Sequence, residues 1–106
     1  MELKEILEFI ESEDKRIRDH YGYTDEEKRI LTRTVKLGEE FGELCEEILS
    51  HHSFQRTDKL EKRDQENLAE EFADVIFTSL LLARSLNVDI EKAMERKMEK
   101  VKKRKY

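Results

Sequence analysis

The 106-residue sequence has no proline and no tryptophan, and it contains only three glycines and one cysteine. Without proline and with so few glycines, it lacks the turn residues that separate the strands of β-sheet proteins. A single cysteine cannot form an internal disulfide, which excludes a disulfide-stabilised scaffold and favours the reducing cytoplasm. No apolar run approaches the roughly 20 residues of a membrane span, and the charged residues 1–5 do not resemble a secretory signal, so we expect no membrane association.

Charged residues make up 44% of the chain, whereas apolar residues make up 37%. Leu, Glu, Lys and Arg are prominent, as is typical of long helices with solvated outer faces. We therefore predict a single all-α domain over residues 1–106. A core this lean is marginal for a monomer, which favours burial between subunits. The net charge of −5 argues against a general nucleic-acid-binding protein.

Hydrophobic periodicity predicts four helices, covering about residues 2–20, 25–52, 65–86 and 90–106. Thr24 is the expected N-cap of the second helix, with Glu27 completing a capping box. Residues 53–64 are polar and predict a solvated connection. Residues 75–83 are apolar almost all round, so we expect this segment to be buried on every side in a homodimer or a dimer of dimers.

Two acidic pairs are the most informative feature of the sequence: Glu40 with Glu43, and Glu71 with Asp74. Residues three apart share one face of a helix, and each pair adjoins an apolar stripe, where a carboxylate is costly without positive charge nearby. Antiparallel packing of the two helices would place the pairs nearly level, with their acidic faces turned either toward each other or both outward. Four converging carboxylates repel one another, and a hard divalent cation relieves that repulsion. We therefore interpret the pairs as a metal site rather than as solvated helix faces.

The segments that carry these acids read KLGEEFGEL over residues 36–44 and LAEEFADVIF over residues 68–77. They resemble the MazG-like nucleotide pyrophosphohydrolases of the all-α nucleoside triphosphate pyrophosphatase superfamily, whose signature is EExxE followed by ExxD. The resemblance extends over about residues 32–104. It implies an oligomeric four-helix MazG-like bundle that cleaves a nucleoside triphosphate between its α- and β-phosphates, releasing monophosphate and pyrophosphate.

The resemblance also implies roles for individual residues. The ligands of Mg²⁺, with Mn²⁺ as the alternative cation, would be Glu40, Glu43, Glu71 and Asp74. The candidate catalytic residues are Glu43, as a metal ligand, and Glu39, which would orient or deprotonate the attacking water, a role for which Glu47 is the alternative. The residues expected to bind the substrate phosphates are Lys36, Lys97, Lys100 and Arg104.

Two other functions stay open at the level of sequence. Phosphoribosyl-ATP pyrophosphohydrolase shares the fold and a similar Lys-x-Gly-Glu-Glu start, although residues 42–44 and 75–77 fit the MazG-like group better. A non-catalytic helical interaction module on the same scaffold is the second alternative, because Val101 occupies a position where family members often carry Asn. Neither the motifs nor their spacing indicates which base or sugar is preferred.

Overall fold

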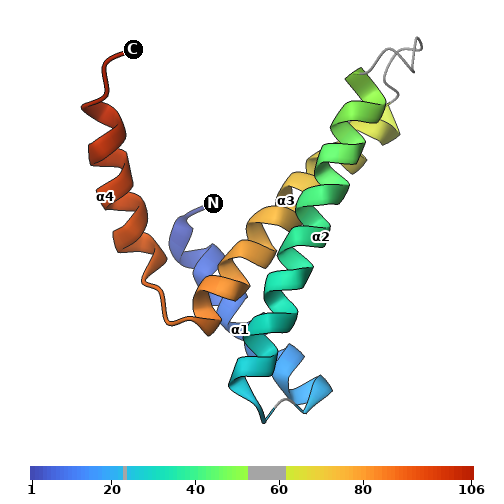
Figure 1. The fold of residues 1–106 in the computed structure, drawn as a ribbon, viewed down its shortest axis with the longest axis vertical. Helices are drawn as coiled ribbons and strands as arrows, with labels where there is room; N and C mark the ends of the chain where they lie inside the picture. Colours follow the sequence, from blue (N-terminus) through green and yellow to red (C-terminus); the bar gives the residue numbers. More distant parts are fainter. Residues whose placement is uncertain (23, 53–61) are drawn as a thin grey trace.

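The computed structural model describes residues 1–22, 24–52 and 62–106, and within these ranges every regular element is an α-helix (Figure 1). The helices are α1 (Leu3–Tyr21), α2 (Glu26–His52), α3 (Lys62–Ser85) and α4 (Ile90–Lys102). The predicted all-α fold is therefore confirmed. Most of the expected solvated connection, residues 53–61, lies outside the described residues. None of the described helices is both long and apolar enough to cross a membrane.

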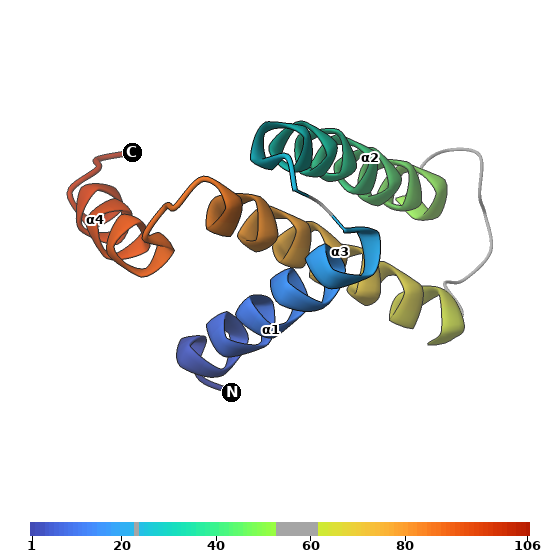
Figure 2. The ribbon, with the colours of Figure 1, turned by 90° about the horizontal axis from the view of Figure 1, so that it is seen from below.

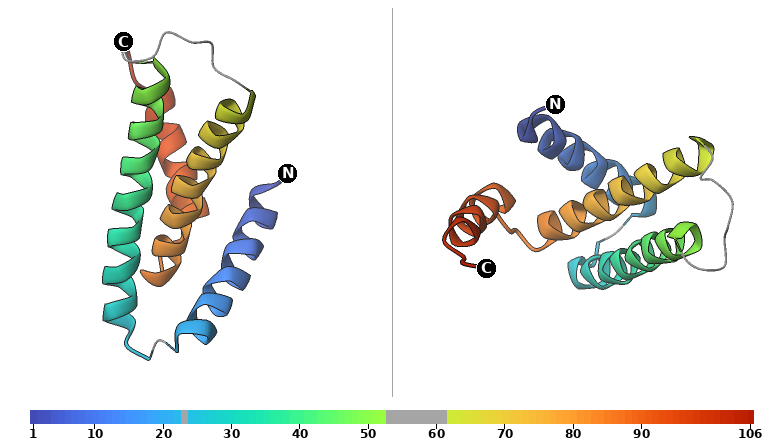
Figure 3. Two further views of the ribbon diagram at one scale, coloured as in Figure 1. Left: turned by 90° about the vertical axis from the view of Figure 1, so that its right-hand side faces the viewer. Right: turned by 90° about the horizontal axis from the view of Figure 1, so that it is seen from above.

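Helices α2 and α3 run antiparallel along each other, and α1 packs against α3 (Figures 2 and 3). The contact between α1 and α3 includes the rings of Phe9 and Phe77, whose centroids lie 5.3 Å apart. Ile10 of α1 and Leu44 of α2 are the buried apolar side chains of the described part of the chain. The α2–α3 hairpin is thus the part of the fold that brings the two acidic motifs together.

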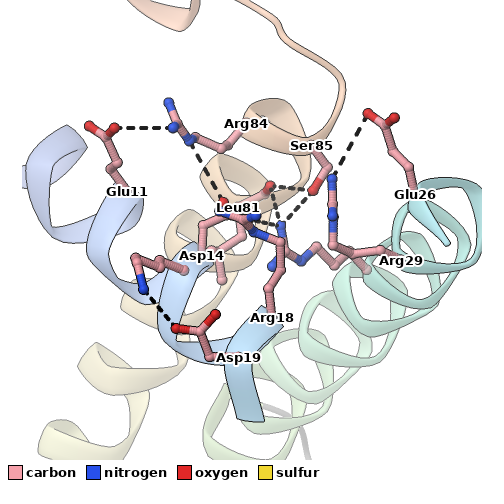
Figure 4. Close-up of polar contacts among 11 residues, drawn as sticks. Glu11, Asp14, Arg18, Asp19, Glu26, Arg29, Leu81, Arg84 and Ser85 are labelled. Atoms are coloured by element: carbon pink, nitrogen blue, oxygen red, sulfur yellow. Dashed lines mark hydrogen bonds and ion pairs between the residues drawn. The ribbon is translucent and has the colours of Figure 1, made fainter. Parts of the chain in front are cut away.

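A buried ion pair joins α1 to the hairpin (Figure 4). Arg33 Nη1 donates to Asp14 Oδ1 and to Ser85 Oγ, each at 2.6 Å, and to the Leu81 carbonyl at 3.3 Å. Arg18 Nε adds a hydrogen bond to Asp14 Oδ2 at 3.1 Å. Asp14, Arg33 and Ser85 are only 5%, 8% and 4% exposed. This polar contact therefore fixes α1, α2 and α3 to one another where apolar burial is sparse.

Helix α2 begins one residue later than predicted. Asp25 is its N-cap: the Asp25 side chain accepts a hydrogen bond from the Lys28 N–H at 3.1 Å, and the Asp25 carbonyl accepts from the Arg29 N–H at 3.1 Å. The predicted capping box of Thr24 and Glu27 is therefore wrong. Asp ranks above Thr as an N-cap, and its negative charge interacts favourably with the positive end of the helix dipole.

Helix α4 stands apart from the other three helices (Figure 1). Asp89 caps its start by accepting from the Lys92 N–H at 3.1 Å, and α4 ends at Lys102 rather than at the end of the chain. None of its residues is buried. Met94 and Met98, one turn apart, are 45% and 56% exposed. The bundle expected from the sequence is therefore not closed around α4 within one chain, because no described part of the chain covers the apolar face of this helix.

Candidate metal centre

Three carboxylates from the two acidic motifs converge between α2 and α3. One oxygen from each of Glu40, Glu43 and Glu71 lies within 4.8 Å of the other two. Glu40 is 8% exposed and Glu71 is half-buried, whereas Glu43 is exposed at the edge of the group. Antiparallel packing produces this arrangement, because it places the middle of α2 beside the first half of α3. We call these three residues the acidic cluster.

Asp74, the fourth predicted ligand, lies outside this group of three and is exposed. Loss of hydration and the charges of Glu40 and Glu70 raise the pKa of Asp74, while the nearby Lys36 ammonium lowers it. Because Glu40 acts on Asp74 through its charge, Asp74 borders the acidic cluster.

The cluster is electrostatically unfavourable without a counter-ion. Loss of hydration raises the pKa of Glu71, and the charges of Glu43, Asp74, Glu40 and Glu47 raise it further. Among the described residues, no hydrogen-bond partner reaches the buried Oε2 atoms of Glu40 and Glu71. A buried acceptor without a partner costs free energy, and carboxylate oxygens are the ligands that Mg²⁺ prefers. The donor set therefore fits a hard divalent cation.

Lys36 is the basic residue that the structure places at the cluster. Its Nζ lies 3.0 Å from Glu40 Oε1 and 3.8 Å from Glu39 Oε2. The hydrogen bond to Glu40 and the Glu40 charge raise the pKa of Lys36, and Glu39 and Glu43 act in the same direction. Glu39 itself is exposed, one residue before the cluster. The Lys36 ammonium by itself compensates only part of the negative charge that the described residues gather here.

The other three basic residues predicted to bind phosphate are not brought to the cluster within one chain. Lys97 and Lys100 lie on α4, and Arg104 follows this helix. All three are exposed. Helix α4 diverges from the α2–α3 hairpin in both views of the ribbon (Figures 1 and 2).

A pocket of about 400 Å³ adjoins the cluster on the side of Lys36, lined by Ile17, Tyr21, Thr32, Arg33, Thr78 and Leu81 together with Lys36. Sequence reasoning missed this pocket and the buried Arg33 on its wall. A signal was present: Asp14 falls between Ile10 and Ile17 at helical spacing, so a charge occupies the apolar stripe of the first helix. Such a charge indicates a buried partner of opposite sign.

Comparisons with known proteins show the family of the chain. The family model of the MazG nucleotide pyrophosphohydrolase domain matches residues 28–106, which include the acidic cluster and the basic tail. A relative from Bacillus subtilis (strain 168), the uncharacterized protein YpjD, is 36% identical over 70 residues, or 66% of this chain and 61% of that relative. The chain thus spans less than two thirds of the relative's length. No solved structure matches. Because the family model covers most of the sequence, the chain belongs to the MazG nucleotide pyrophosphohydrolase domain family.

Proposed function

We propose that the protein is a Mg²⁺-dependent nucleoside triphosphate pyrophosphohydrolase, which cleaves between the α- and β-phosphates to give a nucleoside monophosphate and pyrophosphate. The observation that carries this proposal is the convergence of Glu40, Glu43 and Glu71, with two buried carboxylate oxygens that lack partners. Membership of the MazG family supports the reaction class. The cation is our inference from the chemistry of the cluster, and the nucleoside triphosphate substrate is our inference from membership of the family.

Glu40, Glu43, Glu71 and Asp74 would hold Mg²⁺, with Mn²⁺ as the alternative. When bound, the cation supplies charge for the phosphate oxygens and lowers the pKa of a ligated water. Glu39 would accept a proton from the attacking water, and its exposed position one residue before Glu40 supports this role.

Lys36 is proposed to change partners during substrate binding. In the structure it forms an ion pair with Glu40. If Glu40 held a cation, the charge of Glu40 would be compensated, and the Lys36 ammonium would be free to bind a phosphate oxygen. The pocket beside Lys36 then offers room for the rest of the nucleotide. Its apolar walls, including Ile17 and Leu81, suit a base or sugar rather than further phosphates.

We further propose that the protein is a homodimer or homotetramer and that Lys97, Lys100 and Arg104 reach substrate phosphates only in that assembly. None of residues 75–83 is buried in the single chain, and Ile76 is 53% exposed. Exposed apolar surface on this scale is typical of protein association sites. A second subunit would cover these side chains and would restrict the position of α4.

Product analysis with a matched pair of variants tests the proposed activity. Pyrophosphate and monophosphate should form from at least one member of a panel of ribo- and deoxyribonucleoside triphosphates, and only with Mg²⁺ or Mn²⁺. Turnover of phosphoribosyl-ATP alone would instead indicate the phosphoribosyl-ATP pyrophosphohydrolase alternative. Glu71→Gln should abolish turnover, whereas Glu66→Gln, which removes an exposed charge from the same helix, should retain it. Release of single phosphates, or full activity of Glu71→Gln, would overturn the proposal.

Metal binding is tested without turnover by thermal unfolding. At a Mg²⁺ concentration about 100 times the dissociation constant, binding stabilises the native state by about 2.7 kcal/mol. For a chain of this length that raises Tm by about 11 °C. Glu40→Gln should remove this response. A Mg²⁺ response that survives both Glu40→Gln and Asp74→Asn would show that the cation binds elsewhere.

A further inference from the structure

Lys36 belongs to both parts of the candidate site. Its ammonium forms the 3.0 Å ion pair with Glu40 of the acidic cluster, and Lys36 also lines the pocket beside this cluster. As far as the described residues go, the lining of that pocket contains none of the three acids of the cluster. Lys36 therefore connects the region that would hold the cation with the region that would hold the nucleotide.

The ion pair of Lys36 with Glu40 is poorly explained by the needs of the helix. A Lys four residues before a Glu is the less favourable order on a helix, so the pair adds little to the stability of α2. The hydrogen bond to Glu40 and the Glu40 charge raise the pKa of Lys36, and the charges of Glu39 and Glu43 add to this effect. The ammonium is thus a permanent positive charge at neutral pH, attracted by the acidic motif as a whole.

The two members of this ion pair differ in exposure. The Glu40 side chain is 10% exposed, whereas the Lys36 side chain is 54% exposed. The second carboxylate oxygen of Glu40, Oε2, is buried and has no hydrogen-bond partner among the described residues. Because Lys36 already reaches solvent, its ammonium can leave Glu40 and stay hydrated. Lys36 is therefore the exchangeable partner, and Glu40 is the fixed one.

A divalent cation in the acidic cluster and the Lys36 ammonium would compete for the charge of Glu40. Two positive groups beside the same carboxylate repel each other, so the ammonium lowers the affinity of the cluster for a cation. A phosphate group that pairs with Lys36 removes this opposition. Coupling between two binding sites is reciprocal, so a bound cation would favour phosphate binding by the same factor.

We propose that Lys36 couples binding of the divalent cation to binding of the nucleotide phosphates. Without nucleotide, Lys36 pairs with Glu40 and weakens Mg²⁺ binding. With a polyphosphate in the site, Lys36 pairs with a phosphate oxygen and leaves the Glu40 carboxylate to the cation. This inference rests on the proposed function and adds a selectivity to it: the site binds a cation and a polyphosphate together in preference to the cation alone.

Calorimetric titration with Mg²⁺ in the absence of nucleotide tests the competition directly. Lys36→Met removes the charge and keeps a side chain of similar length, and it should lower the dissociation constant of Mg²⁺ by roughly 10-fold, because a unit charge no longer opposes a doubly charged ion. Lys36→Arg, which keeps the charge, should bind Mg²⁺ no more tightly than the unaltered protein. Lys28→Met is the matched control, because Lys28 is exposed on the same helix about two turns earlier, and it should leave the dissociation constant unchanged.

The coupling is tested by repeating the Mg²⁺ titrations with inorganic tripolyphosphate present and with the concentration of free Mg²⁺ as the variable. Tripolyphosphate supplies the phosphate charge of a nucleotide without a base or a sugar. It should tighten Mg²⁺ binding by a larger factor in the unaltered protein and in Lys28→Met than in Lys36→Met. The factor that remains in Lys36→Met measures direct bridging of the cation and the phosphates, which does not need Lys36. Equal factors in all three proteins would overturn the coupling.

The sign of the Lys36→Met effect separates this inference from other roles of Lys36. Weaker Mg²⁺ binding in Lys36→Met would overturn the inference and show that Lys36 positions Glu40 for the cation. Unchanged binding would also overturn it, and the proposed function would stand. No Mg²⁺ binding by either protein would overturn the metal centre and this inference with it. Tighter binding in a protein that cleaves no nucleotide would support the inference and overturn only the proposed activity. Circular dichroism verifies that each variant is folded.

Discussion

Replacing Asp14 with Asn should destabilise the protein far more than an equivalent change at the surface. The Asp14 carboxylate is 5% exposed and faces Arg33, which is 8% exposed, at 2.6 Å. The substitution leaves the Arg33 guanidinium buried without its counter-ion, while Arg33 Nη2 already lacks a partner among the described residues. Removing one member of a buried ion pair typically costs 3–5 kcal/mol.

We expect the lower end of this range, about 3 kcal/mol, because the Asn amide oxygen still accepts a hydrogen bond. Thermal unfolding of Asp14→Asn should then occur about 12 °C lower than that of the unaltered protein. Asp19→Asn is the matched control on the same helix, because the Lys15–Asp19 pair is 73% and 66% exposed. Exposed pairs contribute at most about 1 kcal/mol. The free energy of unfolding of both variants is measured in urea titrations at one protein concentration. If Asp14→Asn and Asp19→Asn lowered it equally, the buried Asp14–Arg33 pair would not have the stabilising role assigned to it.

The stability lost in Asp14→Asn should depend on pH. Burial opposes ionisation of Asp14, but the Arg33 hydrogen bond and the charges of Arg33, Arg18 and Arg29 hold the Asp14 pKa below its ordinary value of 3.8. A carboxyl whose pKa is lowered on folding contributes stability above its unfolded pKa and loses that contribution as the pH falls through the folded pKa. The stability difference between the unaltered protein and Asp14→Asn should thus be constant near pH 7 and shrink below about pH 4. A difference that persists undiminished to pH 2 would contradict this.

Three further predictions follow from the site and the caps. Folding raises the pKa of Glu71 above its ordinary value of 4.5, so ionisation of Glu71 at higher pH destabilises the folded protein. Metal-free Glu71→Gln should therefore have a higher Tm than the unaltered protein at pH 7 and the same Tm at pH 4. Lys97→Ala and Arg104→Ala should each lower kcat/KM by roughly 10²- to 10³-fold with the Mg²⁺ thermal shift retained, and Lys103→Ala should not. Asp89→Ala should lower the free energy of unfolding by about 1 kcal/mol in urea titrations, through loss of the α4 cap.

The fold and part of the site could be predicted from the sequence because both depend on local spacing. Acids three residues apart on two consecutive antiparallel helices placed Glu43 level with Glu71, and the structure brings their carboxylates together. The start of α2 was predicted wrongly because Thr24 and Asp25 are both good N-caps, and spacing alone does not choose between them. Arg33 was missed for a different reason: pairing with Asp14 depends on how two helices pack, which periodicity within one helix does not specify.

The sequence of one chain predicts that α4 is a helix but does not predict its position. Its cap and its amphipathic pattern specify a helix, and the structure has one. Its position depends on a surface to cover Met94 and Met98, and the described part of the same chain offers none. The proposed roles of Lys97 and Arg104 share this dependence, because a basic residue stabilises phosphate only when it is held beside it. The catalytic proposal for the tail and the assembly proposal are therefore linked, whereas the acidic cluster is already formed by α2 and α3 of one chain.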